Sequence, residues 1–446
     1  MDMFATTESD FEQKFAKLLA RGAMDMASVA PAVRALLDDV RTHGDAAVLE
    51  HITRFDLWNP RSVDDIFVAP SAMQHAYETL APALKEALNL AYKRIFAFHE
   101  KQKPQSWLDF EPTGTMLGQR ALPVERAGLY IPGGKASYPS SLLMNAIPAR
   151  VAGVSDIIVC SPTPHNQINN VLLAAAHLCG VQKFCKVGGA SAIGLLAYGS
   201  ASVPKVDVIT GPGNIFVATA KKFVFGEVNV DMIAGPSEIG IIADESADPH
   251  ALALDMLSQA EHDELASAIL ITPDSALASA VSAAIEAELA TLLRQKIARE
   301  SIDKRGAIIV TRSLDEAMSL MNQIAPEHLE IVTREPFALL PFVQNAGAVF
   351  LGAYTPEPLG DYLAGPNHTL PTGGSARFFS PLSVEHFMKK TSILAFSKQG
   401  ACELADACAA LAESEGLGAH ARSILHRKNL DKNLDKKLDE KESHGF

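Results

Sequence analysis

The chain has 446 residues, of which 48% are hydrophobic, and its formal net charge is −13 at pH 7. Because single hydrophobic cores rarely grow beyond about 250–300 residues, this length indicates two or more domains. The acidic balance argues against non-specific nucleic-acid binding and against docking on an anionic membrane.

The cysteines and the start of the chain favour a reducing compartment. Five cysteines are present, without a Cys-x-x-Cys pair, so we expect buried, inert thiols and neither disulfides nor a catalytic cysteine. The first ten residues are acidic and carry no apolar core, unlike a signal peptide. No apolar run approaches the ~18 residues that span a bilayer. We therefore expect a cytoplasmic protein.

In chain order, the pattern up to about residue 120 is mostly helical, with apolar residues three and four apart. Short β-branched runs then alternate with alanine-rich helical stretches. We expect helices at residues 30–48, 71–99, 141–154, 168–179, 214–225, 249–261 and 313–324. We expect strands at residues 128–131, 156–160, 183–187 and 206–210, and a second series at 239–243, 268–272, 307–311, 329–332 and 348–351.

Alternating strands and helices with nearly continuous apolar strands are typical of parallel sheets that are covered on both faces. The fold class is therefore α/β. The two series of strands indicate two α/β domains. Gly235-Pro236, near residue 238, is the expected crossing point between them.

Two glycine-rich turns follow strands and precede helices, although the Gly-x-Gly-x-x-Gly fingerprint of dinucleotide-binding domains is absent. They are Pro132-Gly-Gly-Lys135 and Gly211-Pro-Gly-Asn214. Each could bring backbone N–H groups close to a pyrophosphate at a helix N-terminus. The glycines could equally serve only to permit tight turns.

Gln259 and His262 are predicted to project from one face of a helix, because they lie three residues apart. The helix is indicated by Asp248-Pro249, a capping residue followed by proline at the first helical position. An imidazole nitrogen and an amide oxygen could fill two positions of a zinc site. Short motifs of this kind more often belong to a solvated helix face or a core histidine, so both interpretations stay open. Further polar residues that could contribute follow at Pro326-Glu-His328, Gly360-Asp-Tyr362, Asn367-His368 and Glu415–His420.

Several longer sequence segments resemble motifs of the histidinol dehydrogenase family. The resemblance runs from about residue 15 to residue 427, with the motifs in the family's order. The resemblance rests on the segments at residues 125–140 (ERAGLYIPGGKASYPS), 211–214 (GPGN), 234–238 (AGPSE), 258–263 (SQAEHD), 326–330 (PEHLE) and 365–368 (GPNH).

The resemblance implies two related, incomplete Rossmann-like parallel-sheet domains, a helical N-terminal segment and a small C-terminal dimerisation domain that reaches over a partner subunit. We expect the N-terminal segment at residues 1–24 and the first α/β domain at 25–129 together with 239–381. The second α/β domain is then expected at 130–238 and the C-terminal segment at 382–446. The charged, repetitive stretch after Lys428 is expected to be a frayed helix or a disordered tail.

The resemblance also implies a site residue by residue. One zinc ion per subunit is expected on Gln259, His262, Asp361 and His420, the last donated by the other subunit. Beyond these metal ligands and His328, the expected substrate contacts are Ser237, His368 and Glu415. NAD is expected near Tyr130, Asn214 and a family glutamine, in whose place this chain has Ser191. Serine is shorter and has a hydroxyl in place of the amide, so we expect NAD to bind with a different affinity.

The implied reaction is the oxidation of L-histidinol to L-histidine with two NAD, in histidine biosynthesis. We expect His328 to take the alcohol proton. Glu327 would ready the water that hydrates the intermediate aldehyde. The expected assembly is a homodimer. Two alternatives stay open: a relative that oxidises another small polyol or amino alcohol, and a non-catalytic paralogue that binds metal or nucleotide.

Overall fold

The structure is a computed structural model and describes residues 1–20, 24–133 and 138–430. The chain divides into two compact units. The first comprises Met1–Lys103 and Pro123–Phe387, and the second comprises Pro104–Leu122 and the chain from Met388 onward. Among the described residues, no helix combines the length and the apolar character that a membrane crossing requires.

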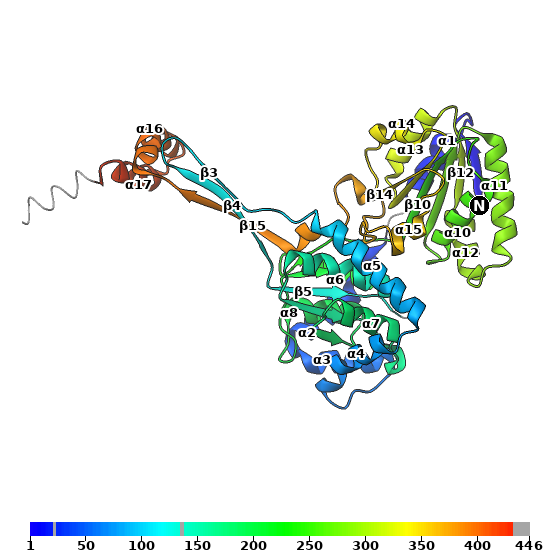
Figure 1. The fold of residues 1–446 in the computed structure, drawn as a ribbon, viewed down its shortest axis with the longest axis horizontal. Coiled ribbons are helices and arrows are strands. Elements are labelled where there is room, and N and C mark those ends of the chain that lie inside the picture. The colour runs from blue at the N-terminus through cyan, green and yellow to red at the C-terminus, as the bar shows by residue number, and fades with distance from the viewer. Residues whose placement is uncertain (21–23, 134–137, 431–446) are drawn as a thin grey trace, which may run out of the picture. The chain divides into compact units, whose positions relative to one another are not determined.

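One six-stranded sheet of the first unit is entirely parallel and has the strand order β1-β12-β11-β10-β13-β14 (Figure 1). Alternate side chains of the strands pack into two separate hydrophobic cores, so the sheet is covered on both faces. Helices α10–α12 pack on one face, and α1, α13 and α14 pack on the other. The strands are β1 (Asp2–Ala5), β10 (Glu238–Ala243), β11 (Ser267–Thr272), β12 (Ala307–Val310), β13 (His328–Val332) and β14 (Ala348–Leu351). The helices are α1 (Phe11–Leu19), α10 (Pro249–Ala260), α11 (Ser275–Leu289), α12 (Gln295–Arg305), α13 (Leu314–Ile324) and α14 (Pro336–Leu339).

The other six-stranded sheet has the order β2-β7-β6-β5-β8-β9 and is parallel except for β2. The strand order reverses between β5 and β8, and at such a switch point the carboxyl ends of the strands leave a crevice for ligands. Its strands are β2 (Phe67–Val68), β5 (Arg126–Tyr130), β6 (Asp156–Cys160), β7 (Lys183–Cys185), β8 (Val208–Thr210) and β9 (Asn229–Val230).

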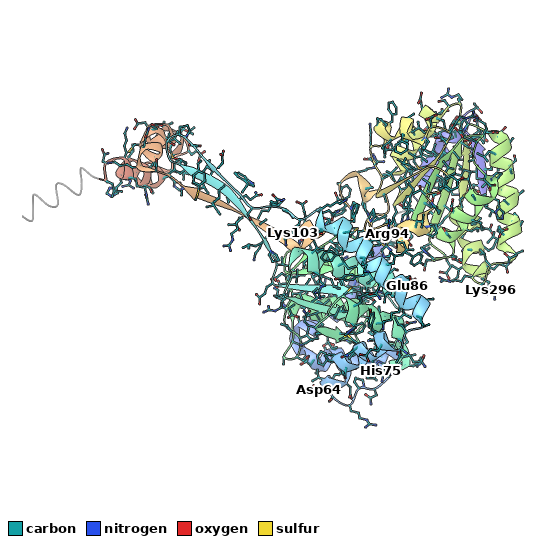
Figure 2. All side chains as sticks on the ribbon, in the orientation of Figure 1. Asp64, His75, Glu86, Arg94, Lys103 and Lys296 are labelled. Carbon is teal, nitrogen blue, oxygen red and sulfur yellow. The ribbon has the colours of Figure 1, made fainter. Side chains whose placement is uncertain are left out.

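Two helical layers accompany this second sheet. The layer that shares a core with it holds α2 (Met26–His43), α3 (Asp45–His51), α8 (Gly189–Tyr198) and α9 (Ile215–Val224). A further layer holds α4 (Pro70–Glu78), α5 (Pro82–Glu100), α6 (Pro139–Ala152) and α7 (Asn170–Leu178). Charged side chains such as Glu86 on α5 and Lys296 on α12 are exposed (Figure 2).

The expected α/β class and most strands are confirmed, but the expected domain boundaries differ from the observed sheets. Residues 25–129 were expected to join 239–381, yet α2 and α3 pack on the sheet of β5–β9, and β5 itself belongs to that sheet. The physical reason is that consecutive strands along the chain usually lie next to one another in the same sheet. The N-terminal segment is not purely helical, since β1 pairs with β12. The chain passes between the sheets after Val230 and before Glu238.

Two long expected helices are each two helices. The helix expected at residues 30–48 is interrupted at Gly44, whose φ of 55° ends α2 and begins α3. The helix expected at 71–99 is interrupted before Pro82, which starts α5 at its first position. Proline fits there because the first helical N–H has no partner within the helix.

The second unit differs from its expected bounds because it also includes Pro104–Leu122, from the first third of the chain. Its three-stranded sheet has the order β15-β4-β3, formed by β3 (Trp107–Phe110), β4 (Met116–Pro123) and β15 (Met388–Ala395). Helices α16 (Lys398–Ser414) and α17 (Gly418–Lys428) pack on each other through small residues such as Ala409 and Ala421. The expected C-terminal segment at 382–446 therefore omits β3 and β4. The tail expected after Lys428 lies almost wholly outside the described residues.

Candidate active site

Gln259 and His262 meet at the end of α10. The helix begins as expected, since the Asp248 side chain accepts a hydrogen bond from the backbone N–H of His250. It ends at Ala260, so His262 lies in the following turn, where its backbone N–H donates to the carbonyl of Gln259 at 3.2 Å. The side chains still lie together, with Gln259 Nε2 3.1 Å from His262 Nδ1.

His328 begins β13 and is buried beside Gln259. Its Nδ1 lies 2.9 Å from Gln259 Oε1 and 3.1 Å from the carbonyl oxygen of Glu238. Because both neighbours are acceptors, Nδ1 carries the proton and Nε2 has a free lone pair. Nε2 is buried without a hydrogen-bond partner. Burial lowers the pKa of His328 to about 4, against the opposing effect of Asp361. The ring is therefore neutral at pH 7 and able to accept a proton.

Glu327 precedes His328 and is also buried. Its Oε2 accepts a hydrogen bond from the backbone N–H of Glu238 at 2.9 Å. Burial raises the pKa of Glu327 well above its usual value, and the charge of Glu238 acts in the same direction. Because a carboxyl group with a raised pKa is a stronger base once it is ionised, Glu327 is suited to proton transfer.

Helix α15 (Glu357–Tyr362) supplies two carboxylates to the same place. One nitrogen or oxygen atom from each of His262, Glu357 and Asp361 lies within 4.8 Å of the others, a spacing that could hold a metal ion. Glu357 was not predicted from the sequence. The signal that could have found it is its position four residues before Asp361, on the same face of a helix.

The two carboxylates have opposite protonation tendencies. Burial raises the pKa of Glu357 to about 9, and the nearby charge of Asp361 adds to this. Burial would also raise the pKa of Asp361, but the hydrogen bond and charge of His368 hold it below its usual value. Asp361 is therefore the ionised member of the pair.

His368 and Ser237 complete this cluster from other elements. His368 Nδ1 lies 3.0 Å from the carbonyl oxygen of Asp361, and its Nε2 lies 3.2 Å from Ser141 Oγ at the start of α6. One cavity, of about 580 Å³, is lined by these groups and by Asn214. Its lining includes Ser141, Asn214, Ser237, His262, Glu327, His328, Asp361 and His368.

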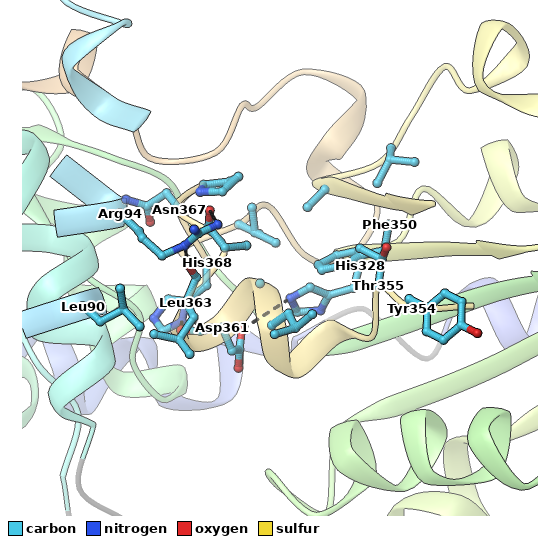
Figure 3. Close-up of a pocket in the computed structure, with 17 residues that line it drawn as sticks. Leu90, Arg94, His328, Phe350, Tyr354, Thr355, Asp361, Leu363, Asn367 and His368 are labelled. Atoms are coloured by element: carbon cyan, nitrogen blue, oxygen red, sulfur yellow. Dashed lines mark hydrogen bonds and ion pairs between the residues drawn. The ribbon is translucent and has the colours of Figure 1, made fainter. Parts of the chain in front are cut away.

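A second cavity, of about 500 Å³, reaches His328 and Asp361 as well. Figure 3 shows His328 Nε2 facing Asp361 Oδ1, 3.9 Å away. Arg94 of α5 lies at another part of this cavity and donates to the carbonyl oxygens of Leu363 and Ala364. These bonds tie α5 to the loop that follows α15.

The glycine-rich turn after β8 lies against the end of β5. Gly211 has a φ of 116°, and a Cβ there would lie 1.9 Å from the carbonyl oxygen of Tyr130, so only glycine fits. A buried ion pair holds the turn, since Lys221 donates to the Gly211 carbonyl and Asp231 accepts from the Gly211 N–H. Asn214 caps α9, and its side chain accepts from two backbone N–H groups.

The other expected cofactor residues lie close to this turn but make protein contacts. The buried Tyr130 hydroxyl accepts from the backbone N–H of Gly189 at 3.2 Å. Ser191 is buried in the first turn of α8 and hydrogen-bonds to His51. Of the turn Pro132-Gly-Gly-Lys135, the last two residues lie outside the described residues.

Glu415 and His420 belong to the second unit. Glu415 follows the end of α16, His420 lies in α17, and both side chains are exposed. The first unit therefore brings together Gln259, His262, His328, Asp361 and His368, with Glu327 and Ser237 beside them. Glu415 and His420 are not part of that cluster within the first unit.

The chain is similar to known proteins over nearly its whole length. The family model described as histidinol dehydrogenase matches residues 19–428. The chain is 63% identical over 426 residues to a histidinol dehydrogenase of Sulfurimonas denitrificans, covering 95% of this chain and 99% of that protein. It is 62% identical over 419 residues to one of Wolinella succinogenes, covering 94% and 97%. The chain belongs to the histidinol dehydrogenase family.

The fold agrees as well. The crystal structure of histidinol dehydrogenase from Elizabethkingia anophelis superposes with a TM-score of 0.90 at 32% identity, covering 97% of this chain and 99% of that one. The resemblance that the motifs indicated is thus confirmed, and the chain is an oxidoreductase of the histidinol dehydrogenase family.

Proposed function

We propose that this protein oxidises L-histidinol to L-histidine through L-histidinaldehyde, with two NAD as electron acceptors. The observation that carries the proposal is the buried, unpartnered Nε2 of His328 beside the potential metal ligands Gln259, His262 and Asp361. A neutral imidazole with a free lone pair is the group that alcohol oxidation requires as a base.

The donor atoms present fit a catalytic zinc ion. Gln259 and Asp361 offer oxygen and His262 offers nitrogen, and burial lowers the pKa of His262, so its ring is available in the neutral form. His420 of the partner subunit would add a fourth protein ligand. Zinc held there would bind the amino and imidazole nitrogens of the substrate and favour the neutral amine.

In the first step, His328 Nε2 accepts the proton of the L-histidinol hydroxyl group. A hydride leaves the carbon that bears this hydroxyl group and is transferred to the nicotinamide of NAD. The Nδ1–H of His328, held by Gln259 and by the carbonyl of Glu238, fixes the tautomer that leaves Nε2 free. The products of this step are the aldehyde, NADH and one proton.

The second oxidation needs water, since a hydride leaves an aldehyde only after hydration to the gem-diol. Glu327 lies next to His328 in the same cavity, and its ionised form can take a proton from the water that adds. The gem-diol then loses a hydride to a second NAD and releases two protons, one from a hydroxyl group and one from the resulting carboxylic acid, to give the carboxylate and NADH. Glu327 and His328 thereby serve successive steps.

The proposed working unit is a homodimer in which each C-terminal unit serves the other subunit. Glu415 and His420 are exposed on the second unit, and neither belongs to the potential metal-binding group of His262, Glu357 and Asp361. The same unit exposes large apolar side chains, among them Trp107, Phe110 and Leu411. Aromatic side chains are enriched in protein–protein contacts, which supports this assembly.

Metal analysis of a His262 variant tests the proposal. His262→Asn should lose tight zinc binding and all NADH formation from L-histidinol, because an amide is a poorer ligand than imidazole. Glu261→Gln is a matched control, since Glu261 is adjacent in sequence but is not in the metal cluster. Full zinc content in His262→Asn would contradict the ligand assignment.

A further inference from the structure

A third cavity, of about 660 Å³, lies where the N-terminal ends of α8 and α9 approach α2 and α3. Its volume is in the range of small-molecule sites. Asn214 lines both this cavity and the active-site cavity, so one extended ligand could reach from His328 past Asn214 into it. The residues that matter below are Asp39, Glu50, His51, Arg54, Asp56 and Ser191, all of which line it.

Three of these side chains form a hydrogen-bonded chain from three different helices. Ser191 Oγ lies 2.8 Å from His51 Nδ1, and His51 Nε2 lies 3.0 Å from Asp39 Oδ2. Ser191 and His51 are buried, with 3% and 5% of their surface exposed, whereas Asp39 is partly exposed. These three hydrogen-bonded side chains thus extend from the edge of the cavity to the first turn of α8.

The proton positions in this chain follow from the partners. An ionised Asp39 can only accept, so His51 Nε2 donates to it. Hydrogen bonding by His43 keeps the pKa of Asp39 low, while burial lowers the pKa of His51 and keeps its ring neutral. Nδ1 of the neutral ring must then accept, and the Ser191 hydroxyl donates to it. The oxygen of Ser191 is left with lone pairs only.

Charge in the cavity is mostly negative. Asp39 from α2, Glu50 from α3 and Asp56 from the following turn contribute carboxyl groups, against the single guanidinium of Arg54. Arg54 stacks over Phe55, with 4.9 Å from its guanidinium carbon to the ring centre. The residues that α8 and α9 contribute to the lining are uncharged. The Asp39 carboxylate would therefore repel a phosphomonoester placed against Ser191, whereas it would not repel an uncharged hydroxyl group.

We propose that this cavity holds the adenosine end of NAD and that the Asp39–His51–Ser191 chain selects NAD over NADP, with Ser191 accepting a hydrogen bond from the 2′-hydroxyl of the adenosine ribose. The inference rests on the proposed function, which supplies the dinucleotide. In many dinucleotide sites an acidic side chain bonds to that hydroxyl directly. Here the carboxylate acts through an imidazole and a serine, and it fixes the direction of the Ser191 hydroxyl.

Binding measurements test this directly, using calorimetry on the metal-loaded protein without L-histidinol. The probes are NAD, its analogue with 2′-deoxyadenosine, and NADP. In the unaltered protein, the deoxy analogue should bind about tenfold more weakly than NAD, as one lost hydrogen bond implies. In Ser191→Ala, NAD and the deoxy analogue should bind equally.

Asp39→Asn should bind NADP about tenfold more tightly than the unaltered protein, because one negative charge near the 2′-phosphate is removed. Asp38→Asn removes the neighbouring exposed carboxylate of α2, which does not line the cavity, and should change neither affinity. This control separates the local effect from a change in overall charge.

Two results would overturn the inference while leaving the proposed function intact. The first is an equal loss of affinity for the deoxy analogue in the unaltered protein and in Ser191→Ala. The second is unchanged NADP binding in Asp39→Asn. If the metal-loaded protein binds none of the three dinucleotides, the cofactor assignment itself falls, together with the inference.

Discussion

At the scale of single residues, His328 shows how neighbours determine a chemical role. Burial keeps its imidazole ring neutral, and two hydrogen-bond acceptors at Nδ1 leave Nε2 as a free base. Glu327, one residue earlier, has the opposite response to burial, since its pKa rises. Adjacent positions thus provide two groups with different proton affinities.

Substitution of these two residues should separate the two oxidations. General acid–base assistance is worth ~10²–10⁴-fold. Glu327→Gln should slow oxidation of supplied L-histidinaldehyde by about that factor and harm the first hydride transfer less. His328→Asn should chiefly slow the alcohol step. Single-turnover NADH formation from each substrate measures both rates. Equal slowing of both steps in both variants would show that the residues act as one unit.

At the scale of elements, the candidate active site depends on short helices and on the loops that hold them. Helix α10 presents Gln259 and positions His262, α15 presents Glu357 and Asp361, and the loop after α15 carries Asn367 and His368. The buried His99 at the end of α5 secures that loop, since Asn367 Nδ2 lies 3.2 Å from His99 Nε2. Asn367 also donates to the carbonyl of Met144 in α6.

His99 should make stability depend on pH. Burial lowers the pKa of His99 in the folded protein. Below the unfolded value of ~6.5, the unfolded chain takes up a proton that the folded protein refuses, so stability falls as pH falls. The slope from one such group is at most about 1.4 kcal/mol per pH unit and ends at the folded pKa.

Denaturant unfolding at pH 7.5 and pH 5.0 measures this contribution. His99→Gln should lose less stability between the two pH values than the unaltered protein. His75→Gln, a change at an exposed histidine of α4, serves as control and should lose as much as the unaltered protein. An unchanged pH dependence in His99→Gln would show that the ring is not held neutral by the fold.

Local signals in the sequence predicted part of this arrangement. Asp248-Pro249 predicted the start of α10, and the spacing of Gln259 and His262 predicted that their side chains meet. The pairing of Ser191 with His51 could not be predicted, because 140 residues separate them and only the packing of α3 on α8 joins them. The sheet of β3, β4 and β15 escaped prediction because β3 and β15 are largely exposed and lack a regular apolar alternation.

At the scale of the whole molecule, the first unit supplies two sheets, one wholly parallel and one parallel except for β2. The bases lie at the start of β13, the potential metal ligands lie on α10, on α15 and in the turn after α10, and the glycine-rich turn follows β8. The second sheet has its switch point between β5 and β8, where Tyr130 and Gly211 meet. The remaining expected ligand, His420, lies in the other compact unit. Because the proposed metal ligands are divided between the two units, the proposed reaction requires the dimer.

Subunit exchange tests that division. His420→Ala and His262→Ala should each be inactive alone, since each lacks a metal ligand. After exchange, a mixed dimer should regain one intact site, which has His262 from one chain and the partner's His420. Activity should therefore return in proportion to the mixed dimers present. Absence of activity despite demonstrated mixed dimers would show that each site is built within a single chain.

The most direct test of the central claim is the yield of NADH from limiting L-histidinol with excess NAD and metal-loaded protein. The proposed four-electron oxidation predicts two NADH per L-histidinol consumed, with L-histidine as the product. A yield of one NADH with accumulation of the aldehyde, or no NADH at all, would contradict it.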